Sequence, residues 1–115
     1  MLLCVLAGKP DTPFNCTLLN QTSSALGVEC VAGFDGGQPQ RFELEVYEGV
    51  DGRRLLANVS ADAPSFTVTG LSPGLVLRML VFGTNSKGRS DPGKLEGFTL
   101  KSAEKQTGTY APWPC

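Results

Sequence analysis

Short segments in which apolar and polar residues alternate constrain the fold of this chain more than any other feature of its sequence. In the segment 41–48, Phe42, Leu44 and Val46 occupy every second position. Successive side chains of a β-strand point to opposite faces of the sheet, so this pattern predicts a strand with one buried and one solvated face. Comparable segments, bounded by turn residues, predict seven strands at residues 14–19, 25–31, 41–48, 53–58, 65–69, 75–84 and 95–101.

Length and composition fit an all-β fold with a single core. The chain has 115 residues, enough for one domain, and its 14 glycines and 8 prolines favour many turns. No segment shows sustained helical periodicity. Seven short strands in a chain of this length predict a two-sheet antiparallel sandwich.

The charge balance and the absence of histidine argue against several classes of function. The formal net charge is −1, so there is no basic field to hold a nucleic acid or an anionic membrane. No segment has the roughly 20 apolar residues that a membrane-spanning helix needs, so we expect no direct membrane insertion. Histidine, the commonest general base and metal ligand, is missing from the chain. We therefore predict no enzyme, with no catalytic residue and no cofactor or metal site.

Three Asn-x-Ser/Thr triplets match the acceptor pattern for N-linked glycans. They begin at Asn15, Asn20 and Asn58, and none has proline in the middle. Acceptors of this kind are used in the secretory pathway. The triplets predict a glycoprotein domain that faces the outside of the cell.

One of these triplets contains a cysteine inside a predicted strand. Strict alternation in the segment 14–19 would place Phe14, Cys16 and Leu18 on the buried face and Asn15 on the solvated face. Cys30 also falls on the buried face of its strand, and the two strands are joined by a short turn. Antiparallel neighbours can bring two Cα atoms within bridging distance, so we predict a Cys16–Cys30 disulfide, with a pair of buried thiols as the alternative. Cys4 and Cys115 are expected to stay outside this bond.

Three spaced motifs resemble the second half of a fibronectin type III domain. They are Leu71-Ser72-Pro73-Gly74, Leu77-x-Met79-x-Val81 and Asn85-x-x-Gly88-x-Ser90-x-Pro92. The resemblance covers roughly residues 10–107 and implies a seven-stranded, immunoglobulin-like sandwich. It divides the chain into a linker or remnant of a preceding domain at 1–9, the domain at 10–107 and a C-terminal tail at 108–115.

The chain departs from the fibronectin type III pattern at two positions. Cys30 stands where the family usually has a tryptophan, and Leu77 stands where it has a corner tyrosine. The missing tyrosine hydroxyl removes a hydrogen bond between strand and turn that is worth about 1 kcal/mol. We expect the disulfide at Cys30 to compensate for this loss.

A longer stretch of the first half resembles one narrower group of proteins. The residues from Lys9 to Thr17, with Asn20-Gln21-Thr22, Val28-x-Cys30 and the glycine-rich segment 33–42, are similar to the membrane-proximal fibronectin domain of the sidestep group. These arthropod cell-surface proteins carry several immunoglobulin domains and act as recognition partners in motor-axon guidance. The resemblance implies immunoglobulin domains before this chain, a single membrane span after it, and an extracellular location.

These observations favour a non-enzymatic module of a cell-adhesion or axon-guidance receptor. Such a module would space neighbouring domains and bind a cell-surface or extracellular protein, with an immunoglobulin-superfamily protein as the narrower expectation. An accessory module of a secreted enzyme, such as a carbohydrate hydrolase, is the alternative. The acceptor triplets and the cysteine pair favour the receptor.

One outward-facing row of side chains is a candidate protein-binding face. If Leu77, Met79 and Val81 point into the core, then Val76, Leu80 and Phe82 point outward. Third and sixth strands pair in this fold, which places Tyr47 on the same surface. A contiguous row of exposed large apolar side chains is typical of an interaction site.

Overall fold

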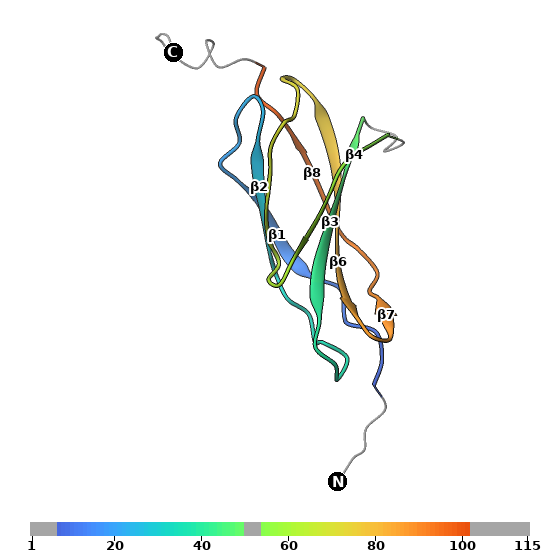
Figure 1. Cartoon of the computed structure of the whole chain (residues 1–115). Helices are drawn as coiled ribbons and strands as arrows, with labels where there is room; N and C mark the ends of the chain where they lie inside the picture. Colours follow the sequence, from blue (N-terminus) through green and yellow to red (C-terminus); the bar gives the residue numbers. More distant parts are fainter. Residues whose placement is uncertain (1–6, 50–53, 102–115) are drawn as a thin grey trace.

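The computed structural model describes residues 7–49 and 54–101 and shows an all-β molecule (Figure 1). Within these residues there is no helix that could cross a membrane. The strands are β1 (Phe14–Leu19), β2 (Leu26–Val31), β3 (Arg41–Glu48), β4 (Arg54–Ala61), β5 (Ser65–Val68), β6 (Val76–Asn85), β7 (Gly88–Arg89) and β8 (Gly93–Phe98).

The strands form two antiparallel sheets that pack face to face (Figure 1). One sheet has the order β1-β2-β5. In the other, β4 pairs with β3, β3 with β6, and β6 also with β7 and β8. The predicted two-sheet sandwich is confirmed. The strand that sequence analysis missed is β7, which has only two residues and is too short to show alternation.

Alternating residues of both sheets fill the core between them. The buried positions of β3 are Phe42, Leu44 and Val46, as the sequence pattern predicted. Cys16 and Leu18 of β1 pack against this cluster from the edge. The other buried apolar side chains of this core cluster are Leu26, Val28, Cys30, Phe66, Val68, Leu71, Leu77, Met79 and Val81.

The predicted burial of Phe14 is wrong, because β1 is not regular. Asn15 has a φ of 53°, and the pairing of β1 with β2 shifts between Phe14 and Thr17. This β-bulge adds one residue to β1 and moves Phe14 out of step with Cys16. Cys16 and Leu18 keep their contacts with the core, whereas the side chain of Phe14 is 49% exposed.

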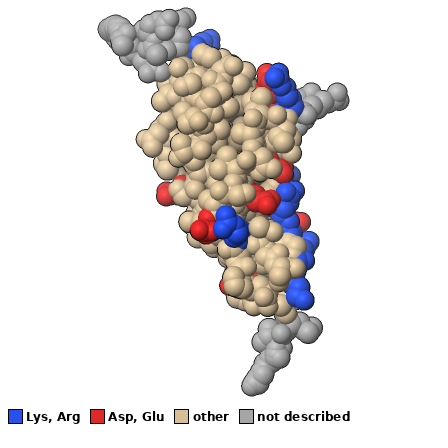
Figure 2. All heavy atoms as spheres, viewed as in Figure 1, with Lys and Arg blue, Asp and Glu red and all other residues tan. Residues whose placement is uncertain are grey.

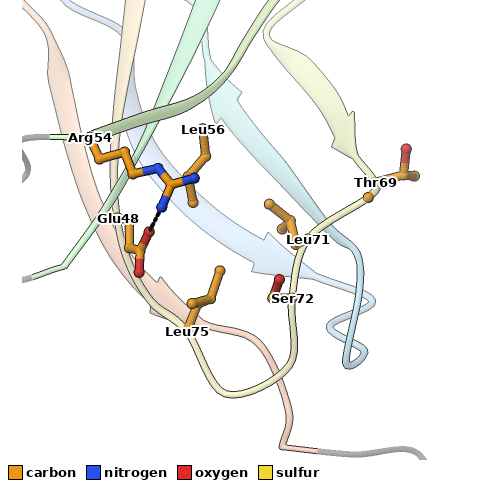
Figure 3. Close-up of a pocket in the computed structure, with 8 residues that line it drawn as sticks. Glu48, Arg54, Leu56, Thr69, Leu71, Ser72 and Leu75 are labelled. Atoms are coloured by element: carbon orange, nitrogen blue, oxygen red, sulfur yellow. Dashed lines mark hydrogen bonds and ion pairs between the residues drawn. The ribbon is translucent and has the colours of Figure 1, made fainter.

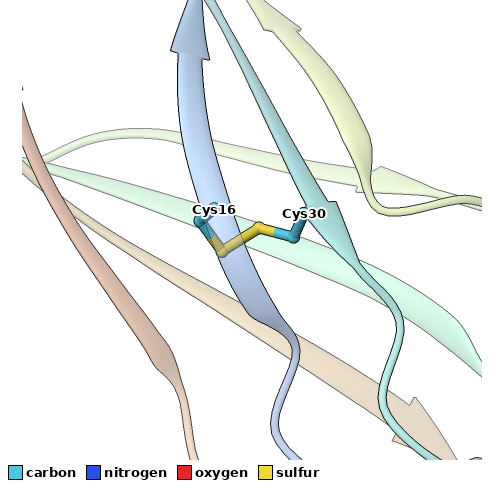
Figure 4. Close-up of a disulfide and its surroundings, with 2 residues drawn as sticks. All are labelled: Cys16 and Cys30. Carbon is cyan, nitrogen blue, oxygen red and sulfur yellow. A yellow bond between two sulfur atoms is a disulfide. The ribbon is translucent and has the colours of Figure 1, made fainter.

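The predicted disulfide is present and joins neighbouring strands of one sheet. Cys16 of β1 is bonded to Cys30 of β2, 14 residues further along the chain (Figure 4). In the chain-entropy model, closing a loop of this size stabilises the folded state by roughly 3 kcal/mol. Cys4 and Cys115 lie outside the described residues.

A threonine that follows β8 makes hydrogen bonds to the backbone of a turn. The missing corner tyrosine would make a hydrogen bond of this kind at another position. The buried hydroxyl of Thr99 donates a hydrogen bond to the carbonyl oxygen of Ser72 at 2.7 Å and accepts one from the backbone N–H of Leu75 at 2.8 Å. It therefore ties the chain after β8 to the turn before β6. Sequence analysis assigned compensation to the disulfide and missed this link.

We expect Thr99→Val to lower the free energy of unfolding by about 2 kcal/mol, since it leaves two partly buried backbone groups without the partner that the buried hydroxyl supplies. Thr99→Ser keeps the hydroxyl and loses one methyl group, so it should cost only about 1 kcal/mol. Urea denaturation of the two variants measures both values. A valine variant as stable as the serine variant would contradict the assigned role of the hydroxyl.

Candidate interaction surface

The predicted binding face lies on the outer side of the β4-β3-β6-β8 sheet. In the pairing of β3 with β6, Glu45 lies opposite Leu80, and Tyr47 lies opposite Arg78. Tyr47 and Leu80 are partly exposed, and Val76 is about half exposed. Phe82 differs, because only 5% of it is exposed although it sits at an outward position.

Arg89 of β7 covers the ring of Phe82. Its guanidinium carbon lies 3.7 Å from the centre of that ring, in the geometry of a cation–π contact. One guanidinium nitrogen donates to Glu43 Oε1 at 3.2 Å and to Glu45 Oε2 at 3.1 Å. The expectation of an exposed Phe82 in a contiguous apolar row is therefore wrong: a charged cluster occupies this half of the face.

Tyr47 extends the cluster along β3. Its hydroxyl donates a hydrogen bond of 2.9 Å to Glu45 Oε1, while the other oxygen of Glu45 accepts from Arg89. Because these groups are partly exposed, each ion pair contributes at most about 1 kcal/mol to stability. Their main effect is to fix the positions of several polar groups on the surface.

The cluster changes the pKa values of two of its members. The hydrogen bond to Glu45, then desolvation and the negative charge of Glu45, raise the pKa of the Tyr47 hydroxyl, and the charge of Arg89 opposes them. Desolvation alone would lower the pKa of Arg89. Hydrogen bonds to Glu43 and Glu45 and their negative charges outweigh it, so the pKa of Arg89 is raised.

Sequence analysis placed Glu43 and Glu45 correctly on a solvated face but did not find their partner. Arg89 lies only four residues after Asn85, and these positions are brought back onto the sheet by the turn between β6 and β7. The order of residues alone does not show that a two-residue strand pairs here. The only sign of this contact in the sequence was a basic residue, Arg89, shortly after β6, the strand that pairs with the one carrying both glutamates.

The exposed apolar side chains of this face gather at its other end. Leu55 lies opposite Tyr47 in the β3–β4 pairing, and Val76 lies opposite Phe98 in the β6–β8 pairing. Leu55, Val76 and Phe98 are each about half exposed. We call Leu55, Tyr47, Val76 and Phe98 the apolar strip. Sequence analysis found Tyr47 and Val76 but not the other two, which belong to strands whose pairing was unknown.

Two hollows lie near this end of the sandwich. One, of about 290 Å³, adjoins the strip and is lined by Gly74, Leu75, Val76, Phe98, Thr99, Leu100 and Lys101. The other, of about 280 Å³, lies between β4 and the segment that follows β5 (Figure 3). Leu56, Leu71 and Leu75 give it apolar walls, and Arg54 pairs with Glu48 at 3.4 Å on its rim. The Glu48 carboxylate at this hollow is therefore engaged in the ion pair with Arg54.

In the view of Figure 2, acidic and basic side chains lie close together and do not form a field of one sign. Among residues 7–49 and 54–101, no three His, Cys, Asp or Glu side chains come close enough together to hold a metal ion. The described part of this face thus combines the apolar strip with the neighbouring charged cluster.

The three glycan acceptors lie on two different sheets. Asn15 and Asn20 are exposed at and just after β1, and both have a positive φ. Asn58 is exposed on β4, directly opposite Glu45. A glycan at Asn58 would therefore stand beside the charged cluster, at the opposite end of the face from Phe98. Whether the acceptors are occupied stays a prediction.

The raised pKa of Tyr47 can be measured directly. The chain has two tyrosines, so Tyr110→Phe leaves Tyr47 as the only one. We expect its near-ultraviolet absorbance to titrate with a midpoint above 10, and Glu45→Gln to move that midpoint back toward 10. The corresponding stability is present below about pH 10 and is lost as the pH rises through the folded pKa.

Glu96→Gln is the matched control for this titration, because Glu96 lies on the same face and pairs with Arg78 instead. It should leave the midpoint of Tyr47 where it was. Equal shifts in the two glutamine variants would mean that the general charge of the face, and not the contact with Glu45, sets the pKa.

Sequence comparisons relate the chain to a short part of much longer proteins. It is 34% identical over 88 residues to nephrin of Mus musculus and 36% identical over 88 residues to nephrin of Homo sapiens. Each alignment covers 75% of this chain and 7% of the relative. Nephrin of Rattus norvegicus is 31% identical over 110 residues, which cover 94% of this chain and 8% of that protein. The chain thus spans less than a tenth of the length of these relatives. No family model matches it.

Solved structures show the same fold at low sequence identity. Domains d3–d4 of the rat CD45 extracellular region match with a TM-score of 0.73 and 21% identity, over 81% of this chain and 51% of that one. The FN5 domain of Drosophila Lar matches with a TM-score of 0.62 and 20% identity, over 79% and 97%. The FN1–FN3 domains of chicken CNTN1 match with a TM-score of 0.69 and 17% identity, over 80% and 33%. In its fold, the chain is a fibronectin type III-like domain.

Proposed function

We propose that this chain is a non-enzymatic extracellular module of a cell-adhesion receptor, which spaces its neighbouring domains and binds a protein partner. The observation that carries the proposal is the 34–36% identity to nephrin over 88 residues, well above the 17–21% shared with the solved structures. The resemblance to the sidestep group, with its role in axon guidance and its immunoglobulin-superfamily partners, is the narrower form of the same proposal.

The path of the chain through the domain supports a spacing role. The segment before β1 and the segment after β8 lie at opposite ends of the sandwich (Figure 1). At the first end, the side-chain amide of Asn85 donates to the carbonyl oxygens of Gly8 and Asp35, both at 2.8 Å. At the other end, Gly74 N–H donates to Leu100 O at 3.0 Å. Neighbouring domains would therefore be held apart by the length of the sandwich.

These contacts bear on the proposed division of the chain. Gly8 N–H donates to Gly36 O at 2.9 Å and Gly8 O accepts from the Asn85 amide, so the described residues just before Pro10 contact the sandwich. A linker or domain remnant at 1–9, a domain at 10–107 and a tail at 108–115 remain our proposal for the full chain. Residues 1–6 and 102–115 lie outside the described part.

The disulfide and the acceptor triplets support an extracellular location. Disulfides persist in oxidising compartments, and the Cys16–Cys30 bond holds the edge strand of the smaller sheet. The exposed positions of Asn15, Asn20 and Asn58 leave all three acceptors accessible on the folded domain. We place the module in the ectodomain of a single-pass membrane protein.

We predict a glycan on at least one of Asn15, Asn20 and Asn58 when the chain is fused to a secretion signal and expressed in animal cells. Asn20 has the highest expected occupancy, because it lies in the exposed turn after β1. Mass spectrometry of peptides before and after enzymatic deglycosylation measures each site. A secreted chain without any glycan would remove the main support for the extracellular location.

The partner is proposed to dock on the apolar strip. In the intact ectodomain, we expect Val76→Glu combined with Phe98→Glu to weaken binding to partner-bearing cells about tenfold or more, as loss of a buried apolar contact does. Secretion and thermal stability should not change, since both side chains are about half exposed. Phe34→Glu, at an exposed position in the loop between β2 and β3, is the control.

Unchanged binding by the folded double variant would show that this face is not the docking site. The sequence that flanks the module separates the two classes of function: immunoglobulin domains support the receptor, and a catalytic domain supports the accessory module of a secreted enzyme.

A further inference from the structure

The irregular strand β1 presents two apolar side chains to solvent beside a glycan acceptor. Phe14 of β1 lies directly opposite Val31 of β2. Both side chains are nearly half exposed, at 49% and 46%. Asn15, the next residue after Phe14, begins the acceptor triplet and is also exposed. An outward apolar pair on a sheet of a water-facing module needs a physical explanation.

The β-bulge is what brings the acceptor and the apolar pair together. In a regular strand, Phe14 and Asn15 would point to opposite faces of the sheet. Because Asn15 has a φ of 53° and the pairing shifts after Phe14, the strict alternation is broken and both side chains are exposed. Asparagine tolerates this left-handed conformation better than most residues do. Phe14 directly precedes the acceptor, with about 3.8 Å between the two Cα atoms, and the bulge leaves both side chains exposed.

We propose that Asn15 carries an N-linked glycan whose first N-acetylglucosamine packs on Phe14 and Val31. A pyranose ring has an apolar face of C–H groups that can cover an aromatic ring, while its hydroxyl groups stay in water. The inference rests on the proposed extracellular location. It adds a structural role for one glycan: the sugar covers apolar surface that the protein itself leaves exposed.

The modification is an ordinary transfer from a lipid-linked oligosaccharide diphosphate in the secretory pathway. The side-chain nitrogen of Asn15 forms a bond to the first carbon of the sugar and loses a proton. The bond from that carbon to the diphosphate oxygen breaks, and the lipid diphosphate leaves. Neither of the other acceptors follows an aromatic residue in the sequence, because Asn20 follows Leu19 and Asn58 follows Ala57. Asn15 is the acceptor whose preceding residue is aromatic and exposed.

A cycle of two substitutions tests the contact in the chain secreted from animal cells. Thr17→Ala removes the acceptor without changing Asn15, and Phe14→Ser removes the ring. We expect Thr17→Ala to lower Tm by about 4 °C when Phe14 is present and by much less in the Phe14→Ser background. Trimming the glycan to its first N-acetylglucosamine should keep the higher Tm, because that sugar makes the contact.

Two controls separate this contact from general effects of glycans and of exposed rings. Thr22→Ala removes the acceptor at Asn20, and Phe34→Ser removes an exposed ring far along the chain from any acceptor. The change in Tm caused by Thr22→Ala should be the same with and without Phe14. The change caused by Thr17→Ala should be the same with and without Phe34. An unoccupied Asn15, or an equal change in Tm with and without Phe14, overturns the inference. If Asn20 or Asn58 is occupied and Asn15 is not, the inference about Asn15 fails but the extracellular location stands. Three unoccupied sites would contradict both the inference and the extracellular location.

Discussion

The whole structure depends on the pairing of strand β6 along both of its edges. β6 pairs with all eight residues of β3 on one side and with all six residues of β8 on the other. Its inward residues Leu77, Met79 and Val81 are buried in the centre of the core. A strand that is paired on both edges and covered on one face has no freedom of register, because a shift by one residue would expose its apolar side chains. The core, the apolar strip and the charged cluster are all positioned by this strand.

Sequence patterns were sufficient wherever a strand was regular and long. The alternation in 41–48 predicted both the bounds and the buried residues of β3, because eight residues are enough to show which face is apolar. The same reasoning failed for Phe14, because a single residue with positive φ reversed the order of the faces. Asparagine at that position was the only sign of a bulge, and asparagine is common in ordinary strand ends and turns.

The surface was predicted less well than the core, and the reason is physical. Burial of an apolar residue depends on its own strand, whereas exposure also depends on what lies over it. Phe82 occupies the outward position that alternation assigns to it, but Arg89 from another strand covers its ring. Leu55 and Phe98 join the strip only through their pairing with β3 and β6. Likewise, the two hydrogen bonds of Thr99 join residues that are 24 and 27 positions apart. Contacts of this range cannot be read from local patterns.

The side-chain amide of Asn85 has a mechanical consequence. In the proposed spacing role, tension along the long axis of the module would enter through the segment that holds Gly8. Asn85 lies at the end of β6 and donates hydrogen bonds to Gly8 and to Asp35, so this load would pass into the strand that is paired along both of its edges. It would then run parallel to the strands and shear many backbone hydrogen bonds at once, instead of breaking them one by one. The neutral amide of Asn85 would thus couple the point where the force enters to β6.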